Sequence, residues 1–260
     1  MLLAVDCGNT HIVLGLFQGE ELIRSWRIAT EGNKTEDEYL SLLQSLLAYD
    51  GYSIQQIEGM IVGSVVPKVT VAFGKMAKKH LRCPSYFVDH TTETGIKVLM
   101  DNPKEVGADR ILNALAAHHK YGGALIVVDF GTATTFDCVS AAGEYLGGAI
   151  CPGIEISQQA LFSHAAKLAN IDLYQPPAVI GKNSADSMRS GILWGYGGQV
   201  DSLSRRMKQE MEGPVRVIGT GGLASFIHNF TEEMDLVDVR LTLDGLRMVW
   251  DMYKDSLSAK

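Results

Sequence analysis

The chain has 260 residues, 46% hydrophobic and 20% charged, and its 23 Lys+Arg against 30 Asp+Glu give a formal net charge of −7. This composition excludes a disordered chain, and the acidic balance argues against a protein that grips nucleic acid through its phosphates. No apolar run approaches the roughly 20 residues that span a bilayer, and the N-terminal MLLAVDCGNT lacks the basic start of a signal peptide. The four cysteines include no C-x-x-C pair, which is typical of free thiols in a reducing compartment. We therefore expect a cytoplasmic protein with neither a nucleic-acid nor a membrane partner.

The first half of the chain reads as three strands followed by alternating helices and strands. Hydrophobic periodicity and turn residues predict strands at 2–6, 12–18 and 21–29, a helix opened by the capping box Thr35-Glu36-Asp37-Glu38, a strand at 60–65, a helix at 69–81, a strand at 85–88 and a helix at 111–120. Asp109 stands where it would begin the last of these helices.

The second half repeats this order. We expect strands at 124–129, 133–140 and 145–150, helices at 154–169 and 185–211, a strand at 215–219, a short helix at 223–229, a strand at 236–240 and a helix at 243–257. Both halves therefore read βββαβαβα, with one extra helix in the second. This predicts an α/β protein of two duplicated lobes with mixed sheets, 1–115 and 116–260, and a ligand cleft between them.

The duplication extends to the turn after the first strand of each half. The two copies lie 123 residues apart and consist of Asp6, Gly8 and Thr10 in the first and Asp129, Gly131 and Thr132 in the second. The glycines permit close backbone approach to a phosphate, and the threonines offer donors. The aspartates repel phosphate, so their role would be to hold a cation or a metal-bound water beside it. The alternative is an ordinary strand-to-hairpin turn, in which Asp and Gly are common.

A third turn, Gly219-Thr-Gly-Gly222, joins a predicted strand to a helix. Adjacent glycines there leave room for a base or a ribose against the backbone. The sequence contains no G-x-x-x-x-G-K-[ST], which excludes a P-loop NTPase, and no G-x-G-x-x-G that opens a βαβ unit, which disfavours a dinucleotide enzyme.

On the duplicated βββαβαβα order, these turns resemble the actin–Hsp70–sugar kinase superfamily, whose lobes are ribonuclease H-like. Within it, the sequence is similar to the type III pantothenate kinases over essentially its whole length. The segments that carry this resemblance are Asp6-Cys-Gly-Asn-Thr10, Gly107-Ala108-Asp109-Arg110, Asp129-Phe-Gly-Thr-Ala-Thr134, Asn183-Ser184 and Gly219-Thr-Gly-Gly222. Gly-Ala-Asp-Arg is the most specific of them.

The resemblance implies an ATP-dependent kinase that converts pantothenate to 4′-phosphopantothenate, the first step of coenzyme A biosynthesis. It implies that Asp109 is the proton acceptor and that Asp129 binds a monovalent cation, K⁺ or NH₄⁺, while Mg²⁺ accompanies ATP. The implied ATP-binding residues are Asp6, Cys7, Gly8, Asn9, Thr10, His11, Ile12, Val13 and Thr132. The implied substrate-binding residues are Gly107, Ala108, Asp109, Arg110 and Ser184. The family also implies a homodimer.

Simpler interpretations of these residues stand beside the implied ones. Asp109 can serve as the N-cap of the helix that runs from Ile111, and Arg110 can form a surface salt bridge. The glycines that interrupt the long helix at 185–211 indicate close backbone packing, either inside the protein or in a dimer interface.

Two positions depart from the family pattern. Met100 precedes Asp101-Asn102-Pro103 where a substrate-contacting Tyr is common, and Ser184 replaces a Thr. Met supplies packing but no phenol hydroxyl. Met100 keeps open a second hypothesis, a catalytically altered nucleotide-binding regulatory protein of the same family. A third, a sugar kinase or polyphosphate hydrolase of the superfamily, would share the Asp-x-Gly turns but should lack Gly-Ala-Asp-Arg.

Overall fold

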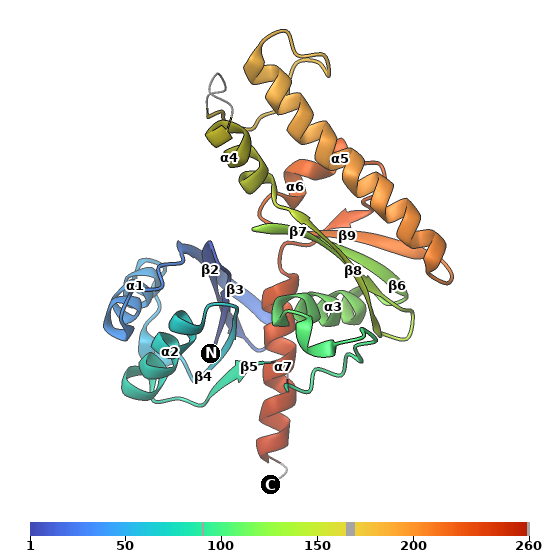
Figure 1. Ribbon diagram of the computed structural model, residues 1–260. Coiled ribbons are helices and arrows are strands. Elements are labelled where there is room, and N and C mark those ends of the chain that lie inside the picture. The colour runs from blue at the N-terminus through green and yellow to red at the C-terminus, as the bar shows by residue number, and fades with distance from the viewer. Residues whose placement is uncertain (90, 165–169, 259–260) are drawn as a thin grey trace. The chain divides into compact units, whose positions relative to one another are not determined.

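The computed structural model describes residues 1–89, 91–164 and 170–258, with side chains up to 254 in the last helix. The chain divides into two compact units. Unit 1 comprises Met1–Gly95, Asn102–Ala116 and the chain from Leu241, and unit 2 comprises Ile96–Asp101 and Ala117–Arg240. Each unit is built around one five-stranded sheet (Figure 1).

Unit 1 contains a mixed sheet of order β3-β2-β1-β4-β5. Its strands are β1 (Leu2–Cys7), β2 (His11–Gln18), β3 (Glu21–Ala29), β4 (Gly59–Ser64) and β5 (Ser85–Val88). The central strand β1 pairs antiparallel with β2 and parallel with β4. The glycine predicted in the β2–β3 turn, Gly19, has a φ of 60°, in the left-handed region that favours glycine.

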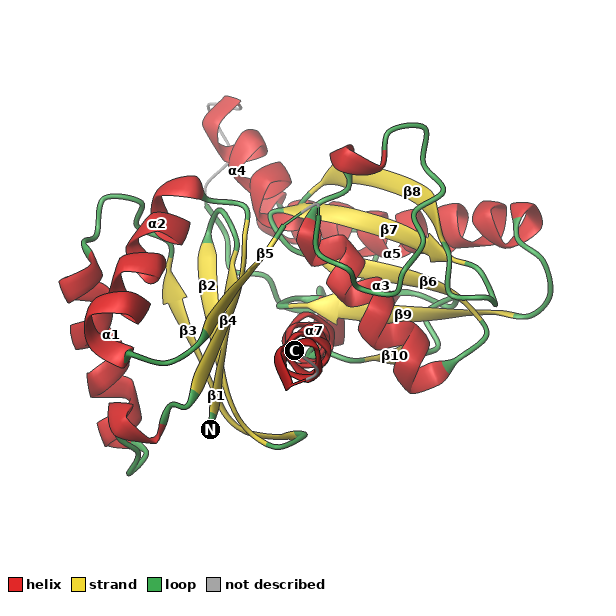
Figure 2. Ribbon diagram, turned by 90° about the horizontal axis from the view of Figure 1, so that it is seen from below, coloured by secondary structure: helices red, strands yellow, loops and turns green. Residues whose placement is uncertain are grey.

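Helices cover both faces of this sheet (Figure 2). Helices α1 (Glu36–Tyr49) and α2 (Pro67–Met76) lie on one face and enclose a core that includes Leu3, Val5, Leu14, Tyr39 and Phe73. The predicted capping box opens α1: the Glu38 backbone N–H donates to Thr35 Oγ1, and the Thr35 N–H donates to Glu38 Oε2. Helix α7 (Leu241–Ser258) contacts β1 and β4 from the other face.

Unit 2 repeats this architecture. Its strands are β6 (Ala124–Phe130), β7 (Ala133–Val139), β8 (Tyr145–Pro152), β9 (Val215–Gly221) and β10 (Leu236–Val237), in the order β8-β7-β6-β9-β10. Strand for strand this is the order of unit 1, and β6 again pairs antiparallel with one neighbour and parallel with the other. The predicted duplication of an α/β lobe with a mixed sheet is therefore confirmed.

The helices of unit 2 pack on one face of its sheet around a second core. They are α4 (Ile154–His164), α5 (Ser184–Glu210) and the short α6 (Ala224–Ile227). The helix predicted at 154–169 is observed to His164, and its remainder, 165–169, lies outside the described residues. The strand predicted at 236–240 ends at Val237, because Asp238 Oδ1 accepts a hydrogen bond from the Arg240 N–H and turns the chain.

Helix α3 (Ala108–Tyr121) and the segment before it run from one unit to the other. The segment Ile96–Asp101 joins unit 2 because the Tyr145 N–H donates to the Lys97 carbonyl and the Leu99 N–H donates to the Tyr145 carbonyl. The C-terminal helix α7 joins unit 1, although sequence order placed it with the second half. Amphipathic periodicity shows that a helix covers a sheet but does not show which of two sheets it covers.

Candidate functional site

The first Asp-x-Gly turn lies at the end of the central strand of unit 1. Asp6 is aligned with Val13 on β2 and with Gly63 on β4. The turn that follows is closed by the Gly8 N–H, which donates to the His11 carbonyl at 3.0 Å, and Thr30 Oγ1 donates to the Gly8 carbonyl at 2.7 Å. These bonds hold an exposed loop, whose tip is Asn9 and Thr10. The loop can therefore present backbone groups to a ligand without rearrangement.

Alternation along β1 separates the core from the candidate site. Leu3, Val5 and Cys7 face the core beneath α1 and α2, so Asp6 faces the opposite side of the sheet. Among the predicted ATP-binding residues, Cys7 and Ile12 are thus core side chains, and a ligand would meet their backbone only. Burial, reinforced by the Asp6 charge, raises the pKa of the Cys7 thiol far above its usual range. This thiol is neutral and takes no part as a nucleophile.

Asp109 lies in the first turn of α3, and the N-cap alternative is wrong. The helix begins at Ala108, because the N–H groups of Arg110 and Ile111 both donate to the Gly107 carbonyl. Asp109 Oδ1 accepts the Arg110 N–H at 2.9 Å and folds back over Gly107, where a Cβ would lie only 2.4 Å from it. Gly107 is therefore required by the position of the Asp109 carboxylate.

Asp109 and Asp6 belong to the same unit and the same side of its sheet. Leu112, one helical turn after Asp109, packs on β4 so closely that a Cβ on Gly63 would lie 3.3 Å from its Cδ1. Gly63 is the residue aligned with Asp6. Packing of α3 on β4 thus places two motifs that are about 100 residues apart in the sequence on the same side of this sheet.

The second Asp-x-Gly turn lies at the equivalent place in unit 2 and is one residue shorter. Asp6 is aligned with Val13 seven positions later, whereas Asp129 is aligned with Thr135 six positions later. The Gly131 N–H donates to the Ala133 carbonyl at 3.0 Å, and Thr132 is exposed at the tip. The two copies of the motif are therefore similar in position but not in turn geometry.

Asp129 lies beside the glycine-rich turn after β9. Gly221 has a φ of 88°, and a Cβ there would lie 2.5 Å from Asp129 Oδ1 and 2.7 Å from the Phe130 carbonyl oxygen. A carboxylate and a carbonyl oxygen thus converge on a space that any side chain at position 221 would fill. Hard oxygen ligands of this kind suit a hard cation, and the residues present therefore fit the cation that the family implies.

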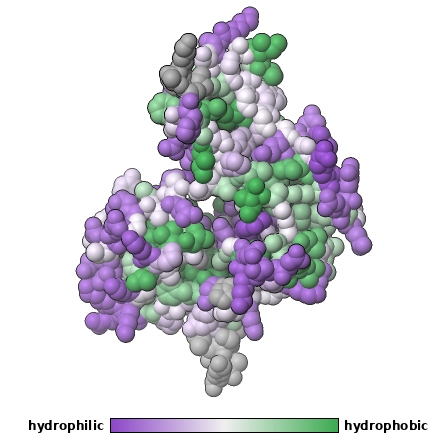
Figure 3. Space-filling model, in the orientation of Figure 1, coloured by the Kyte–Doolittle hydropathy of each residue, from purple (hydrophilic) through white to green (hydrophobic). Residues whose placement is uncertain are grey.

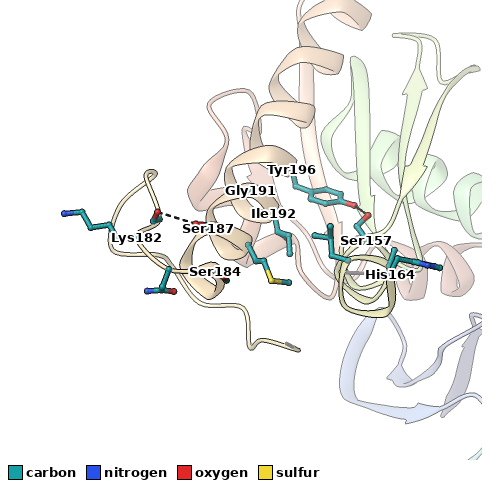
Figure 4. A pocket seen from close by; sticks show the side chains of 13 residues that line it. Ser157, His164, Lys182, Ser184, Ser187, Gly191, Ile192 and Tyr196 are labelled. Carbon is teal, nitrogen blue, oxygen red and sulfur yellow. Dashed lines mark hydrogen bonds between the residues drawn. The ribbon is translucent and has the colours of Figure 1, made fainter. Parts of the chain in front are cut away.

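Ser184 is the first residue of α5, within unit 2. The side chain of Asn183 caps this helix by accepting the Asp186 N–H at 2.9 Å. Ser184 lines a cavity of about 1220 Å³ between α4 and α5, whose other walls include Leu161, Met188, Ile192, Ser157 and Tyr196 (Figure 4). The Ser157 and Tyr196 side chains point toward one another, with their hydroxyl oxygens 2.7 Å apart.

Two structural features of this region, the Asn183 cap and the Ser157–Tyr196 pair, were not predicted from the sequence. An Asn just before a helical run is an N-cap signal that could have identified Asn183. The Ser157–Tyr196 pair joins residues 39 positions apart on different helices, so no sequence pattern announces it. Burial raises the pKa of the Tyr196 hydroxyl, although its hydrogen bond with Ser157 opposes this.

The described residues contain neither a metal-binding cluster nor a helix that could span a membrane. In residues 1–89, 91–164 and 170–258, no group of three or more His, Cys, Asp or Glu side chains is arranged to hold a metal ion. Over the same part of the chain, no helix combines the length and the apolar character needed to cross a membrane.

Two units with the same five-stranded mixed sheet and an Asp-x-Gly turn after each central strand define the fold of the actin-like sugar kinases. Among solved structures, component A of (R)-2-hydroxyglutaryl-CoA dehydratase from Acidaminococcus fermentans aligns with a TM-score of 0.54 and 13% identity, covering 100% of this chain and 99% of that one. The inorganic polyphosphate/ATP-glucomannokinase from Arthrobacter sp. strain KM aligns with a TM-score of 0.50 and 13% identity, covering 98% of both chains. Likeness at this identity concerns the fold alone.

Sequence comparison narrows this class to one family. The family model for type III pantothenate kinase matches residues 2–206. The type III pantothenate kinase of Moorella thermoacetica is 49% identical over 251 residues, which is 96% of this chain and 99% of that protein. The type III pantothenate kinase of Myxococcus xanthus is 46% identical over 250 residues, covering 96% and 98%. The chain therefore belongs to the type III pantothenate kinase family.

Proposed function

We propose that this protein transfers the γ-phosphate of ATP to the primary hydroxyl of pantothenate and so forms 4′-phosphopantothenate, at the first step of coenzyme A biosynthesis. The observation that carries the proposal is the family match over nearly the whole chain, together with an intact Gly107–Arg110 element at the start of α3.

Asp109 is the proposed proton acceptor. Phosphoryl transfer depends mainly on positioning and charge neutralisation, and a carboxylate within reach of the attacking hydroxyl takes its proton. The hydrogen bond from the Arg110 N–H and the close approach to Gly107 support the role, because they set the orientation of this carboxylate. Arg110, the next residue, offers a planar fork suited to the carboxylate of pantothenate.

The loop from Asp6 to Val13 is the proposed ATP site, and Thr132 makes a further ATP contact. Backbone and hydroxyl donors at the exposed Asn9 and Thr10 suit phosphate oxygens, and Gly8 permits close approach of the backbone. Asp6 is the carboxylate that would organise the Mg²⁺ that accompanies ATP, since it faces away from the core and towards the side where α3 packs.

Asp129 is the proposed ligand of a monovalent cation, K⁺ or NH₄⁺. The convergence of its carboxylate with the Phe130 carbonyl beside Gly221 supports this assignment. The cation would add positive charge near the proposed ATP contact at Thr132 in the same unit, and such charge stabilises the negative charge that develops in phosphoryl transfer.

We also propose a homodimer in the cytoplasm. On α5, a Cβ atom added at Gly191, Gly195 or Gly198 would meet no other atom within 4 Å. These glycines therefore leave one face of the helix open. Apolar side chains gather over α4 and the start of α5 in the upper part of Figure 3. The exposed large apolar side chains of this part of the chain include Ile156, Leu161 and Phe162 on α4 and Ile180 in the loop before α5. Exposed apolar area of this kind indicates an interaction surface, and sedimentation of the purified protein tests it.

The experiment that tests the function measures pantothenate-dependent release of ADP, first in sodium buffer with ATP and Mg²⁺ and then with potassium added. We expect turnover that requires pantothenate and rises with potassium. Binding of ATP without pantothenate-dependent ADP release in either buffer would contradict the proposal.

The Asp109→Asn variant tests the mechanism. The amide keeps the shape of the carboxylate but cannot accept the proton, so kcat should fall by about 10²–10⁴-fold with ATP binding little changed. A kcat near that of the wild type would remove Asp109 from the reaction.

A further inference from the structure

Arg189 is a buried arginine on α5 that bonds to the loop before this helix. It is 8% exposed. Its Nε donates to the Asp172 carbonyl at 2.9 Å, its Nη1 donates to Asp186 Oδ1 at 3.0 Å, and its guanidinium lies 3.7 Å from the centre of the Tyr174 ring. A planar fork that bonds in two directions while stacking on a ring is a geometry that lysine cannot reproduce.

A chain of hydrogen bonds leads from Arg189 to the start of α5. Asp186 uses one carboxylate oxygen for Arg189 and the other to accept Asn183 Nδ2 at 2.8 Å, while its N–H donates to Asn183 Oδ1. Asn183 directly precedes Ser184. Arg189 is therefore linked through Asp186 to the residue that sets the position of the Ser184 backbone.

The loop itself is seated on the same helix at two further points. Ser190 Oγ donates to the Val179 carbonyl, and Ser187 Oγ donates to the Gly181 carbonyl at 3.3 Å. The approach at Gly181 is so close that a Cβ there would lie 2.3 Å from the Ser187 nitrogen. The loop from Asp172 to Lys182 is thus held on α5 at Asp172, Val179 and Gly181, and Lys182 and Ser184 at its end line the cavity.

We propose that Arg189 is a positioning residue for pantothenate binding, which holds the 172–183 loop and the Asn183 cap so that the Ser184 hydroxyl meets the substrate. The inference rests on the proposed function, because it takes Ser184 as a substrate contact. Arg189 acts through Asp186 and Asn183, so its loss should weaken pantothenate binding and leave the chemical step and ATP binding largely unaffected.

The kinetic test compares Arg189→Lys and Asp186→Asn with Arg206→Lys, a matched change at an exposed arginine of the same helix. Loss of one charge-assisted hydrogen bond predicts a rise of about tenfold in the KM for pantothenate, with kcat and the KM for ATP within about twofold. The control should match the wild type. In a Ser184→Ala/Arg189→Lys double variant, the KM should exceed that of the worse single variant by less than about twofold, because both changes remove the same contact.

A second readout follows the loop without any kinase activity. Trypsin cleaves after Lys182 faster when the surrounding loop opens. Mass spectrometry should therefore show cleavage at Lys182–Asn183 several-fold faster in Arg189→Lys than in the wild type, with no such change in Arg206→Lys. Should Arg189→Lys fail to fold, Tyr174→Leu removes only the stacking partner, whose side chain is half exposed.

The two readouts separate the possible failures. An unchanged KM for pantothenate in a folded, active Arg189→Lys protein overturns the inference, as does an equal fall in kcat and kcat/KM. If the wild type shows no pantothenate-dependent ADP release, the proposed function fails. The rate of trypsin cleavage alone then tests whether Arg189 holds the loop, and a rate in Arg189→Lys equal to that of the wild type shows that it does not.

Discussion

Replacing Gly107 with alanine should displace the Asp109 carboxylate while leaving the fold intact. The new Cβ would lie 2.4 Å from Asp109 Oδ1, where ordinary contacts begin at about 3.4 Å, so the carboxylate must retreat by about 1 Å. The backbone itself is not strained, because Gly107 lies outside the left-handed region. The retreat breaks or weakens the bond from the Arg110 N–H to Oδ1, now 2.9 Å.

The expected effect is a fall in kcat of about 100-fold, since a misplacement of about 1 Å at a reacting group costs about that factor. A fall of about 100-fold corresponds to an increase of about 2.7 kcal/mol in the activation barrier. The free energy of unfolding should change by less than about 1 kcal/mol, because the weakened hydrogen bond opposes the gain from replacing glycine. The assay is pantothenate-dependent ADP release over a range of ATP and pantothenate concentrations, with urea unfolding beside it.

Gly74→Ala is the matched control. It lies inside α2 of the same unit, and its new Cβ would meet only the Phe87 ring at 3.6 Å, an ordinary contact. Activity should be unchanged and stability slightly raised, by about 0.5–1 kcal/mol. A Gly107→Ala protein with the kcat of the wild type would refute the argument, because it would show that the observed carboxylate position does not matter to the reaction.

Three further changes test the site and the fold. Asp129→Asn should abolish the stimulation of ADP release by potassium over sodium, and retained stimulation would remove the carboxylate from the cation site. Met100→Tyr should lower the KM for pantothenate by about fivefold, since a phenol adds a hydrogen bond worth about 1 kcal/mol; an unchanged or higher KM contradicts this. Burial alone raises the pKa of Asp238, but hydrogen bonds from Lys120, Tyr121 and the Arg240 N–H outweigh it and hold that pKa below its usual value. The ionised carboxylate therefore stabilises the fold at neutral pH, and this contribution is lost as the pH falls below about 4. Between about pH 6 and about pH 3, the urea midpoint of unfolding should fall less for Asp238→Asn than for the wild type. An equal fall in the two proteins would show that Asp238 contributes nothing to acid sensitivity.

Local features of the chain were predictable because they depend on neighbours in sequence. The capping box of α1 and the glycine-bearing hairpin turns were predicted at the residues where they occur. Alternation and 3.6-residue periodicity placed nearly all strands and helices, and the repeat of these elements predicted two α/β lobes with mixed sheets, which the structure has. The turn motifs, of which the first begins at Asp6 and the last ends at Gly222, could also be identified from the sequence, because glycine and aspartate in tight turns have few structural alternatives.

Two local interpretations were wrong, one at the start of a helix and one where a distant contact decides the local geometry. Asp109 was weighed as an N-cap, but α3 begins at Ala108, because the Gly107 carbonyl accepts the first helical hydrogen bonds. The last strand is shorter than its pattern, because Asp238 turns the chain towards Lys120 and Tyr121, more than 100 residues earlier. No window of neighbouring residues contains that information.

By itself the sequence determined which elements form, that they are duplicated, and which residues are candidates for phosphate chemistry, since backbone sterics and hydrophobic periodicity act over a few residues. Only the tertiary structure decided which sheet α7 covers, that Gly221 leaves space beside Asp129, and that Arg189 connects to the Ser184 cap. These outcomes depend on close packing between segments far apart in the chain, where a displacement of about 1 Å separates a contact from a clash.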